Sequence, residues 1–299
     1  MSDTAVAVVL ALGAGLSYAV AAVLQQKVAA QQPPELSLSP RLIVALAKRP
    51  LWLVGIVFDV GAYLLEAAAL GFGSVVIVGP LLVSGLLFAI PLATFGTGQH
   101  ATRREMVPAV MVTLGLALFV GVGEPTGGGS VASGLAWAIA GGVIALLAGT
   151  ALYLGHRPGT APNRRALMYG LATGTLYGLT AVLTKATVDL LADGDGALSV
   201  LGHWQPYALV TVSIAALVLN QSAFQAGHVA ASLPVIAVAN PVLSATLGVA
   251  LFGETLGAQS PLEWAVTAGA IVMMVLGTSR LASSPLVAHE VEHVPALQV

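Results

Sequence analysis

The segment from residue 131 to residue 154 reads VASGLAWAIAGGVIALLAGTALYL and contains no charged side chain. As an α-helix it would extend about 36 Å at 1.5 Å per residue, which exceeds the ~30 Å hydrocarbon core of a bilayer. A transmembrane β-strand would alternate polar and apolar residues with a period of two, and this segment does not. It therefore predicts a membrane-spanning helix.

Similar apolar segments recur along the chain. We expect them at residues 4–26, 50–70, 74–95, 106–123, 131–154, 166–191, 206–226, 230–252 and 263–281. The first has no basic residue before it and is longer than the apolar part of a signal peptide, so we expect it to stay uncleaved. The predicted fold class is an all-α polytopic membrane protein with about nine transmembrane helices.

The composition of the whole chain agrees with this fold class. Of 299 residues, 57% are hydrophobic and 8% are charged, against roughly 25% charged in a soluble domain. The mean hydropathy is +0.93. A lipid bilayer is therefore the expected partner, and a soluble enzyme or a nucleic-acid-binding protein is excluded. The chain has no cysteine, which excludes disulfides and thiolate metal sites.

The loops of this nine-helix plan differ in charge from one side of the membrane to the other. One side carries Lys27, Arg41, Lys48, Arg49, Arg103, Arg104, Arg157, Arg164, Arg165 and Arg280, and the other side carries no Lys or Arg. Basic loops stay in the cytoplasm. We therefore expect a plasma-membrane protein with its N-terminus outside and its C-terminus in the cytoplasm.

The chain also resembles itself. Residues 15–24 (GLSYAVAAVL) and 174–183 (GTLYGLTAVL) share Gly, Tyr and Ala-Val-Leu at an offset of 159. We expect a first four-helix repeat at 1–123, a linking helix at 131–154, a second repeat at 166–281 and a disordered cytoplasmic tail at 282–299. An odd number of crossings separates the repeats, which inverts the second one. Inverted repeats around a site at the midplane are typical of secondary transporters.

Three stretches resemble a known family. They are residues 49–55 (RPLWLVG), residues 72–80 (FGSVVIVGP), and residues 220–227 (NQSAFQAG) with the SLP at 232–234 and the FGE at 252–254. The four-helix unit resembles the small multidrug resistance unit, and the 4+1+4 arrangement resembles the EamA-like drug/metabolite transporter superfamily. Within it, the stretches are similar to the NIPA-type magnesium transporters. The resemblance implies transport of a small polar solute or metabolite, or alternatively of Mg²⁺ or another divalent cation.

The sequence departs from these relatives at acidic positions. The small multidrug resistance proteins carry a glutamate in the first helix, where this chain has Tyr18 and no acidic neighbour. Tyr63 stands where the NIPA-type proteins have a glutamate in the second helix, and Glu66 stands where they have an asparagine. The sequence therefore does not favour simple exchange of a proton for a cationic drug.

Ionisable side chains inside a membrane segment are costly and are functional candidates. Asp59 and Glu66 lie seven residues apart, so they share a helix face with Tyr63. A desolvated carboxyl group favours its neutral form and could carry a proton. Two carboxylates with water could instead bind a hard cation. The alternative is a structural carboxyl group paired with a hydroxyl or a lysine.

Polar residues of the second half complete the predicted substrate or coupling-ion site. Asn220 and Gln221 need hydrogen-bond partners, which a substrate or a neighbouring helix could supply. Tyr18 and Tyr177 are related by the repeat, and either line the cavity or only pack. An offset of 154, anchored on Pro80 and Pro234, would place Asn220 opposite Glu66, whereas an offset of 161, anchored on Pro80 and Pro241, would not.

Lys185 lies inside the sixth segment at a depth that matches Glu66, which allows an intramembrane ion pair between them. Asp189, four residues further on, is the alternative partner.

Two further patterns concern helix geometry. Pro80, Pro234, Asn240 and Pro241 predict interrupted helices that line a cavity, with a tolerated proline as the alternative. Gly170, Gly174 and Gly178 form a stripe with a period of four, echoed by Ala11, Gly15 and Ala19. This stripe predicts close helix packing.

No phosphate-binding Gly-x-x-x-x-Gly-Lys-Ser/Thr motif and no hydrolase motif occurs in the sequence. We therefore expect neither ATP-driven transport nor an enzyme, and no cofactor or firm metal site. The expected state is a monomer or homodimer. A membrane scaffold that transports nothing is the remaining alternative, although a scaffold gains little from carboxyl groups at the midplane.

Overall fold

The computed structural model describes residues 3–72, 81–82, 84–94, 102–123, 125–126, 132–192, 199–253, 255–256 and 260–282. The helices of the first part are α1 (Asp3–Ala29), α2 (Pro40–Ala47), α3 (Pro50–Phe72), α5 (Gly85–Thr94) and α6 (Arg103–Gly123). They continue with α7 (Gly134–His156), α8 (Pro162–Ala192), α9 (Gln205–Ala226), α10 (Val229–Phe252) and α11 (Pro261–Ala282). The strands β1 (Pro125–Thr126) and β2 (Thr255–Leu256) pair antiparallel. Short 3₁₀ turns occupy Pro34–Leu36 and Ser199–Gly202.

The fold is that of a polytopic helical membrane protein. Among the described residues, six helices are long and apolar enough to cross a bilayer, namely those at Ala5–Ala29, Gly134–His156, Pro162–Thr187, Gln205–Ala226, Val229–Phe252 and Pro261–Leu281. Large apolar side chains also face outward, such as Leu135 at 72% exposure and Leu146 at 70% on α7. Lipid is the environment in which such a surface is stable.

The count of nine membrane helices stays a prediction. Helices α3 and α6 have 23 and 21 residues, lengths that fit a crossing. The third predicted segment, 74–95, is described only in part, and its described portion includes α5. Pro80 and all but the first residue of the predicted tail, 282–299, lie outside the described residues.

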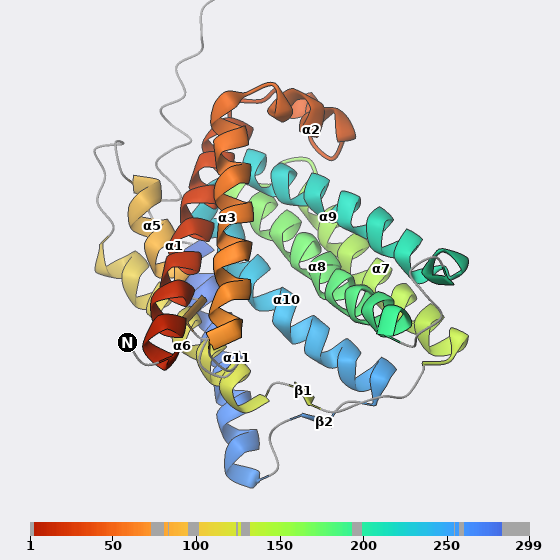
Figure 1. Ribbon diagram of the computed structural model, residues 1–299. Coiled ribbons are helices and arrows are strands. Elements are labelled where there is room, and N and C mark those ends of the chain that lie inside the picture. Colours follow the sequence, from red (N-terminus) through yellow and green to blue (C-terminus); the bar gives the residue numbers. More distant parts are fainter. Residues whose placement is uncertain are drawn as a thin grey trace, which may run out of the picture.

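The two halves of the chain repeat the same contacts between helices (Figure 1). In the first half α1 lies against α3 and α5, and in the second half α8 lies against α9 and α10. Helix α6 of the first half lies against α11 of the second. Small residues permit these approaches. A Cβ on Gly174 would lie 2.7 Å from Ala239 Cβ, and one on Gly85 would lie 2.6 Å from the carbonyl oxygen of Gly15. The predicted packing of the glycine stripe is therefore confirmed: Gly170, Gly174 and Gly178 all contact α10.

One expectation about helix geometry is wrong. Helix α10 runs without a break through Pro234 and Pro241, so neither proline ends a helix. The alternative, prolines tolerated within a continuous helix, is correct for this segment. Each still lacks an N–H and so deprives the carbonyl four residues earlier of its helical donor. For Pro241 that carbonyl belongs to Ala237.

Loops from distant parts of the chain meet at the two ends of the bundle. At one end, β1 after α6 pairs with β2 after α10. At another, the segment after α1 contacts the end of α9: Gln225 Nε2 donates to the carbonyl of Pro33 at 2.7 Å, and Leu38 N–H donates to Ser222 Oγ at 2.9 Å.

Candidate functional site

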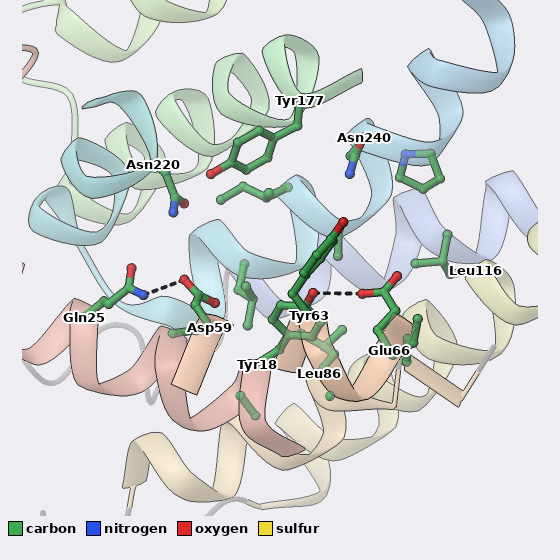
Figure 2. Close-up of a pocket in the computed structure, with 18 of the residues that line it drawn as sticks. Tyr18, Gln25, Asp59, Tyr63, Glu66, Leu86, Leu116, Tyr177, Asn220 and Asn240 are labelled. Atoms are coloured by element: carbon green, nitrogen blue, oxygen red, sulfur yellow. Dashed lines mark hydrogen bonds between the residues drawn. The ribbon is translucent and has the colours of Figure 1, made fainter. Parts of the chain in front are cut away.

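A cavity of about 760 Å³ lies between helices of the first and second halves of the chain. Its described lining comes from α1, α3, α5, α6, α8, α9 and α10, with Leu82 just before α5. The polar or aromatic lining residues are Tyr18, Gln25, Asp59, Tyr63, Glu66, Tyr177, Asn220, Phe224 and Asn240. Figure 2 shows that the two carboxyl groups share one side of this cavity, while Asn220, Tyr177 and Asn240 project toward it from the other side.

The carboxyl wall belongs to α3, and its two acids are spaced as predicted. Asp59, Tyr63 and Glu66 all line the cavity. Tyr63 is 64% exposed, whereas Asp59 and Glu66 are partly buried. The expected shared face of these three residues is therefore confirmed.

Each carboxyl group has its own partner on α1. Tyr18 OH donates to Glu66 Oε2 at 2.8 Å, and Gln25 Nε2 donates to Asp59 Oδ2 at 2.7 Å (Figure 2). Tyr18 and Gln25 are seven residues apart, as are their two partners, so α1 and α3 lie side by side with their polar residues in register. Gly55 makes this fit possible, because a Cβ there would lie 2.9 Å from Gln25 Cγ.

The opposite wall carries polar groups of the second half. Tyr177 comes from α8, Asn220 from α9 and Asn240 from α10. Within the described part of the chain, neither the side-chain amides of Asn220 and Asn240 nor the hydroxyl group of Tyr177 has a hydrogen-bond partner. A polar group in an apolar environment is stabilised by about 1–3 kcal/mol when it gains a hydrogen bond. This wall can therefore bind a ligand that supplies donors and acceptors.

The structure places three other predicted site residues away from the cavity surface. Gln221 is 0% exposed and lies behind the wall, where it accepts from Trp52 Nε1 at 3.1 Å and donates to Gln25 Oε1 at 2.7 Å. Pro234 is buried and is not among the described lining residues, unlike Pro241. Lys185 also lies outside the described lining, with its ammonium group 4.7 Å from the centre of the Phe252 ring. Whether it pairs with Glu66 or Asp189 stays a prediction.

Sequence reasoning missed Gln25 and Trp52. Gln25 is 2% exposed and donates a hydrogen bond to Asp59, which the sequence had marked as a candidate, and Trp52 is 5% exposed. A signal for Gln25 was present, since an amide within an apolar segment needs a partner as much as Gln221 does. Trp52 carried no comparable signal, because tryptophan is ordinary in a membrane segment.

The electrostatic character of the site follows from its lining. Two carboxyl groups face the cavity, and none of its described lining residues is a lysine or an arginine. The remaining surface is mostly apolar. Such a lining disfavours an anion and accommodates a neutral or positively charged molecule of some length.

Fold and cavity together define a polytopic helical membrane protein with a ligand-sized, mostly apolar chamber that carries polar groups on two walls. No family model matches the chain, and no solved structure matches it. The chain is similar to the uncharacterized protein Cgl0250/cg0304 of Corynebacterium glutamicum, with 29% identity over 284 residues that cover 94% of this chain and 96% of that protein. The similarity extends over nearly the full length of both chains, so it includes the helices that form the cavity.

Proposed function

We propose that this protein is a secondary transporter of the drug/metabolite transporter superfamily, which moves a small polar organic solute across the plasma membrane by alternating access. The observation that carries the proposal is the cavity itself. Its walls come from both halves of the chain, and the polar groups on one half face those on the other across it. A site placed between two repeats can open to either side when the repeats move relative to one another.

Matching contacts between helices support the inverted repeat. Helix α1 lies against α3 and α5, and α8, which holds the matching sequence, lies against α9 and α10. An offset of 154 relates Glu66 on α3 to Asn220 on α9, and both line the cavity. Equivalent positions of the two repeats therefore provide an acid on one wall and an amide on the other.

Contacts between loops support the proposed orientation. The positive-inside rule assigns the loops that hold β1 and β2 to the outside, and these two strands pair with each other. The basic segment after α1 and the α9–α10 turn are both assigned to the cytoplasm, and Gln26 Nε2 on α1 lies 3.4 Å from the carbonyl oxygen of Gly227 in that turn. Segments predicted on one side of the membrane thus meet one another.

Geometry favours an organic solute over a divalent cation. Seven helical residues separate Asp59 from Glu66 by about 10 Å along the axis. Their partners on α1 are seven residues apart as well, which keeps the carboxyl groups apart. Two oxygens bound directly to one Mg²⁺ would lie within about 4 Å of each other, because Mg²⁺–oxygen distances are ~2.1 Å. We therefore propose a solute with an amine or other donor group for the carboxyl wall and a hydrogen-bonding group for the amide wall.

Uptake into proteoliposomes tests the proposal. Purified protein would be reconstituted and supplied in parallel with Mg²⁺ and with a panel of radiolabelled amines, amino-amides and neutral polyols, each with and without a proton gradient. We expect saturable uptake of an amine-bearing solute that is lost in Glu66→Gln and Asp59→Asn. Glu263→Gln is the matched control, because this carboxyl group accepts from Ser260 N–H at the start of α11, outside the described cavity lining.

The other outcomes identify the alternatives. Saturable Mg²⁺ entry that is lost in Glu66→Gln would establish cation transport and overturn the organic-solute proposal. No uptake of any compound above that of empty liposomes, with a loss of thermal stability as the only effect of the two acid substitutions, would support a scaffold.

A further inference from the structure

Four side chains form a continuous hydrogen-bonded chain that ends at the cavity. Trp52 Nε1 donates to Gln221 Oε1 at 3.1 Å, Gln221 Nε2 donates to Gln25 Oε1 at 2.7 Å, and Gln25 Nε2 donates to Asp59 Oδ2 at 2.7 Å. We refer to Trp52, Gln221, Gln25 and Asp59 as the amide chain. It starts on α3, crosses to α9, and returns to α3 through α1.

The direction of the amide chain is chemically determined. An indole N–H can only donate a hydrogen bond. Gln221 must therefore present its oxygen to Trp52 and its nitrogen to Gln25, which must in turn accept with its oxygen. Gln25 is left with its N–H groups facing Asp59. The tryptophan thus orients two amides whose oxygen and nitrogen could otherwise be exchanged.

Burial makes this orientation persistent. Trp52 is 5% exposed, Gln25 is 2% exposed and Gln221 is 0% exposed, so water cannot readily replace a lost partner. A buried donor or acceptor left unpaired costs about 1–3 kcal/mol. Gly55 contributes by leaving room for Gln25, because a Cβ there would lie 2.9 Å from Gln25 Cγ.

As a consequence, the two carboxyl oxygens of Asp59 have different roles. Oδ2 accepts from Gln25, which leaves Oδ1 for the cavity (Figure 2). The other titratable groups that line the cavity are Tyr18 on α1, Tyr63 and Glu66 on α3, and Tyr177 on α8. None of the described lining residues is a lysine or an arginine, so the amide of Gln25 is the donor that the structure provides for the carboxylate form of Asp59.

We propose that Gln25 is a positioning residue that stabilises the carboxylate of Asp59 with one oxygen directed to the ligand, and that the amide chain links this carboxylate to the contact between the two halves. The proposal rests on the proposed function, since alternating access moves the halves relative to one another. Gln221 is the member of the chain on α9. When α9 moves away from α1 and α3, Trp52 and Gln25 both lose their partner, and the donor to Asp59 is no longer oriented.

The link predicts a signal at the far end of the chain. A charged acceptor strengthens the hydrogen bond that it receives, and each bond in a chain polarises the next. The carboxylate of Asp59 therefore strengthens the hydrogen bond from Trp52 to Gln221, although Asp59 and Trp52, the two ends of the amide chain, lie seven residues apart on α3. Protonation of Asp59 weakens it.

Nuclear magnetic resonance of the indole groups tests this link in the full-length protein. The protein would be labelled with ¹⁵N at its tryptophan indoles and held in detergent micelles, and the Trp52 resonance would be assigned by its absence in Trp52→Phe. We expect the indole proton of Trp52 to move upfield as the pH is lowered and Asp59 becomes protonated. This movement should be lost in Asp59→Asn and in Gln25→Leu.

Matched variants separate this link from a general structural effect. Gln26→Leu removes the same group from the next position of α1, outside the amide chain, and should leave the Trp52 titration intact. Glu66→Gln should leave it intact as well, because Glu66 is partnered by Tyr18. Gly55→Ala keeps every polar group but displaces Gln25, and should abolish the titration.

A Trp52 resonance that does not respond to pH, or that responds equally in Asp59→Asn, would overturn the proposal. The measurement needs no transported solute, so its failure would leave the proposed transport function standing. Conversely, a pH-dependent Trp52 resonance in a protein without transport activity would support the amide chain and contradict the transport proposal.

Discussion

The close contact between α8 and α10 makes Gly174→Ala the sharpest test of the packing. The added Cβ would lie 2.7 Å from Ala239 Cβ, 3.0 Å from the carbonyl oxygen of Ile236 and 3.2 Å from Ile236 Cα. Carbon atoms in favourable contact are about 3.5–4.0 Å apart. None of these atoms belongs to a flexible side-chain end, so the helices must separate by about 1 Å. Overpacking of this kind costs about 1–3 kcal/mol.

The same substitution has an opposing effect that a control can measure. Replacing glycine by alanine inside a helix is favourable by about 0.5–1 kcal/mol when space is available. An added Cβ on Gly149 of α7 would have no atom within 4 Å apart from its chain neighbours and the backbone of its own helix. Gly149→Ala should therefore be neutral or stabilising, and the difference between the two variants isolates the clash. Unfolding of the purified protein in detergent, followed by circular dichroism, would measure both.

A compensating change checks the assigned contact. Ala239→Gly removes the nearest atom, so the double variant with Gly174→Ala should recover part of the lost stability. The remaining contact with the Ile236 carbonyl oxygen, at 3.0 Å, prevents full recovery. If Gly174→Ala proved as stable as Gly149→Ala, or if Ala239→Gly brought no recovery, the close approach of α8 and α10 would be refuted.

Two further predictions concern the connections at the ends of the helices. His228 Nδ1 accepts from Ala230 N–H at 3.1 Å and caps α10. His228→Ala should therefore lower the free energy of unfolding by about 1 kcal/mol, whereas His228→Asn, which retains a capping acceptor, should lower it less. Equal losses of stability in denaturant titrations would contradict the cap. Gln225 Nε2 donates to the carbonyls of Pro33 at 2.7 Å and Gln32 at 3.2 Å, so Gln225→Leu should speed hydrogen exchange at residues 34–39, read by mass spectrometry, with residues 136–150 of α7 as the internal reference; an unchanged rate would show that this tether does not hold the segment.

The sequence predicted the helices well because one strong signal dominates a membrane protein. Segments without charge had to become helices, since lipid offers no partner for backbone N–H and C=O groups. The predicted segments 131–154 and 206–226 match α7 and α9 within a few residues. The continuity of α10 was predicted less well. Proline tolerance depends on how neighbouring helices satisfy the freed carbonyls, and a pattern along one helix does not contain that information.

The candidate site could be predicted in part for a similar reason. Asp59, Glu66, Asn220, Tyr18 and Tyr177 stood out as polar groups in apolar segments, and all five line the cavity. Gln221 stood out equally but lies behind the wall. Helical periodicity assigns adjacent residues to faces about 100° apart, and Asn220 and Gln221 accordingly point to different neighbours. Which of the two faces the cavity depends on how α9 is rotated, and tertiary packing decides that rotation.

The two walls of the cavity differ in a way that bears on how a ligand would be bound. On the first half, both carboxyl groups already accept hydrogen bonds from α1. On the second half, the amides of Asn220 and Asn240 have no such partner in the described part of the structure. A ligand therefore competes with Tyr18 or Gln25 on one wall and completes hydrogen bonds on the other. The net gain per hydrogen bond is larger at the unpartnered wall, because no existing bond is lost there. Binding of the solute should accordingly depend on the amides of the second half for affinity, while the carboxyl groups of the first half decide which charge is accepted.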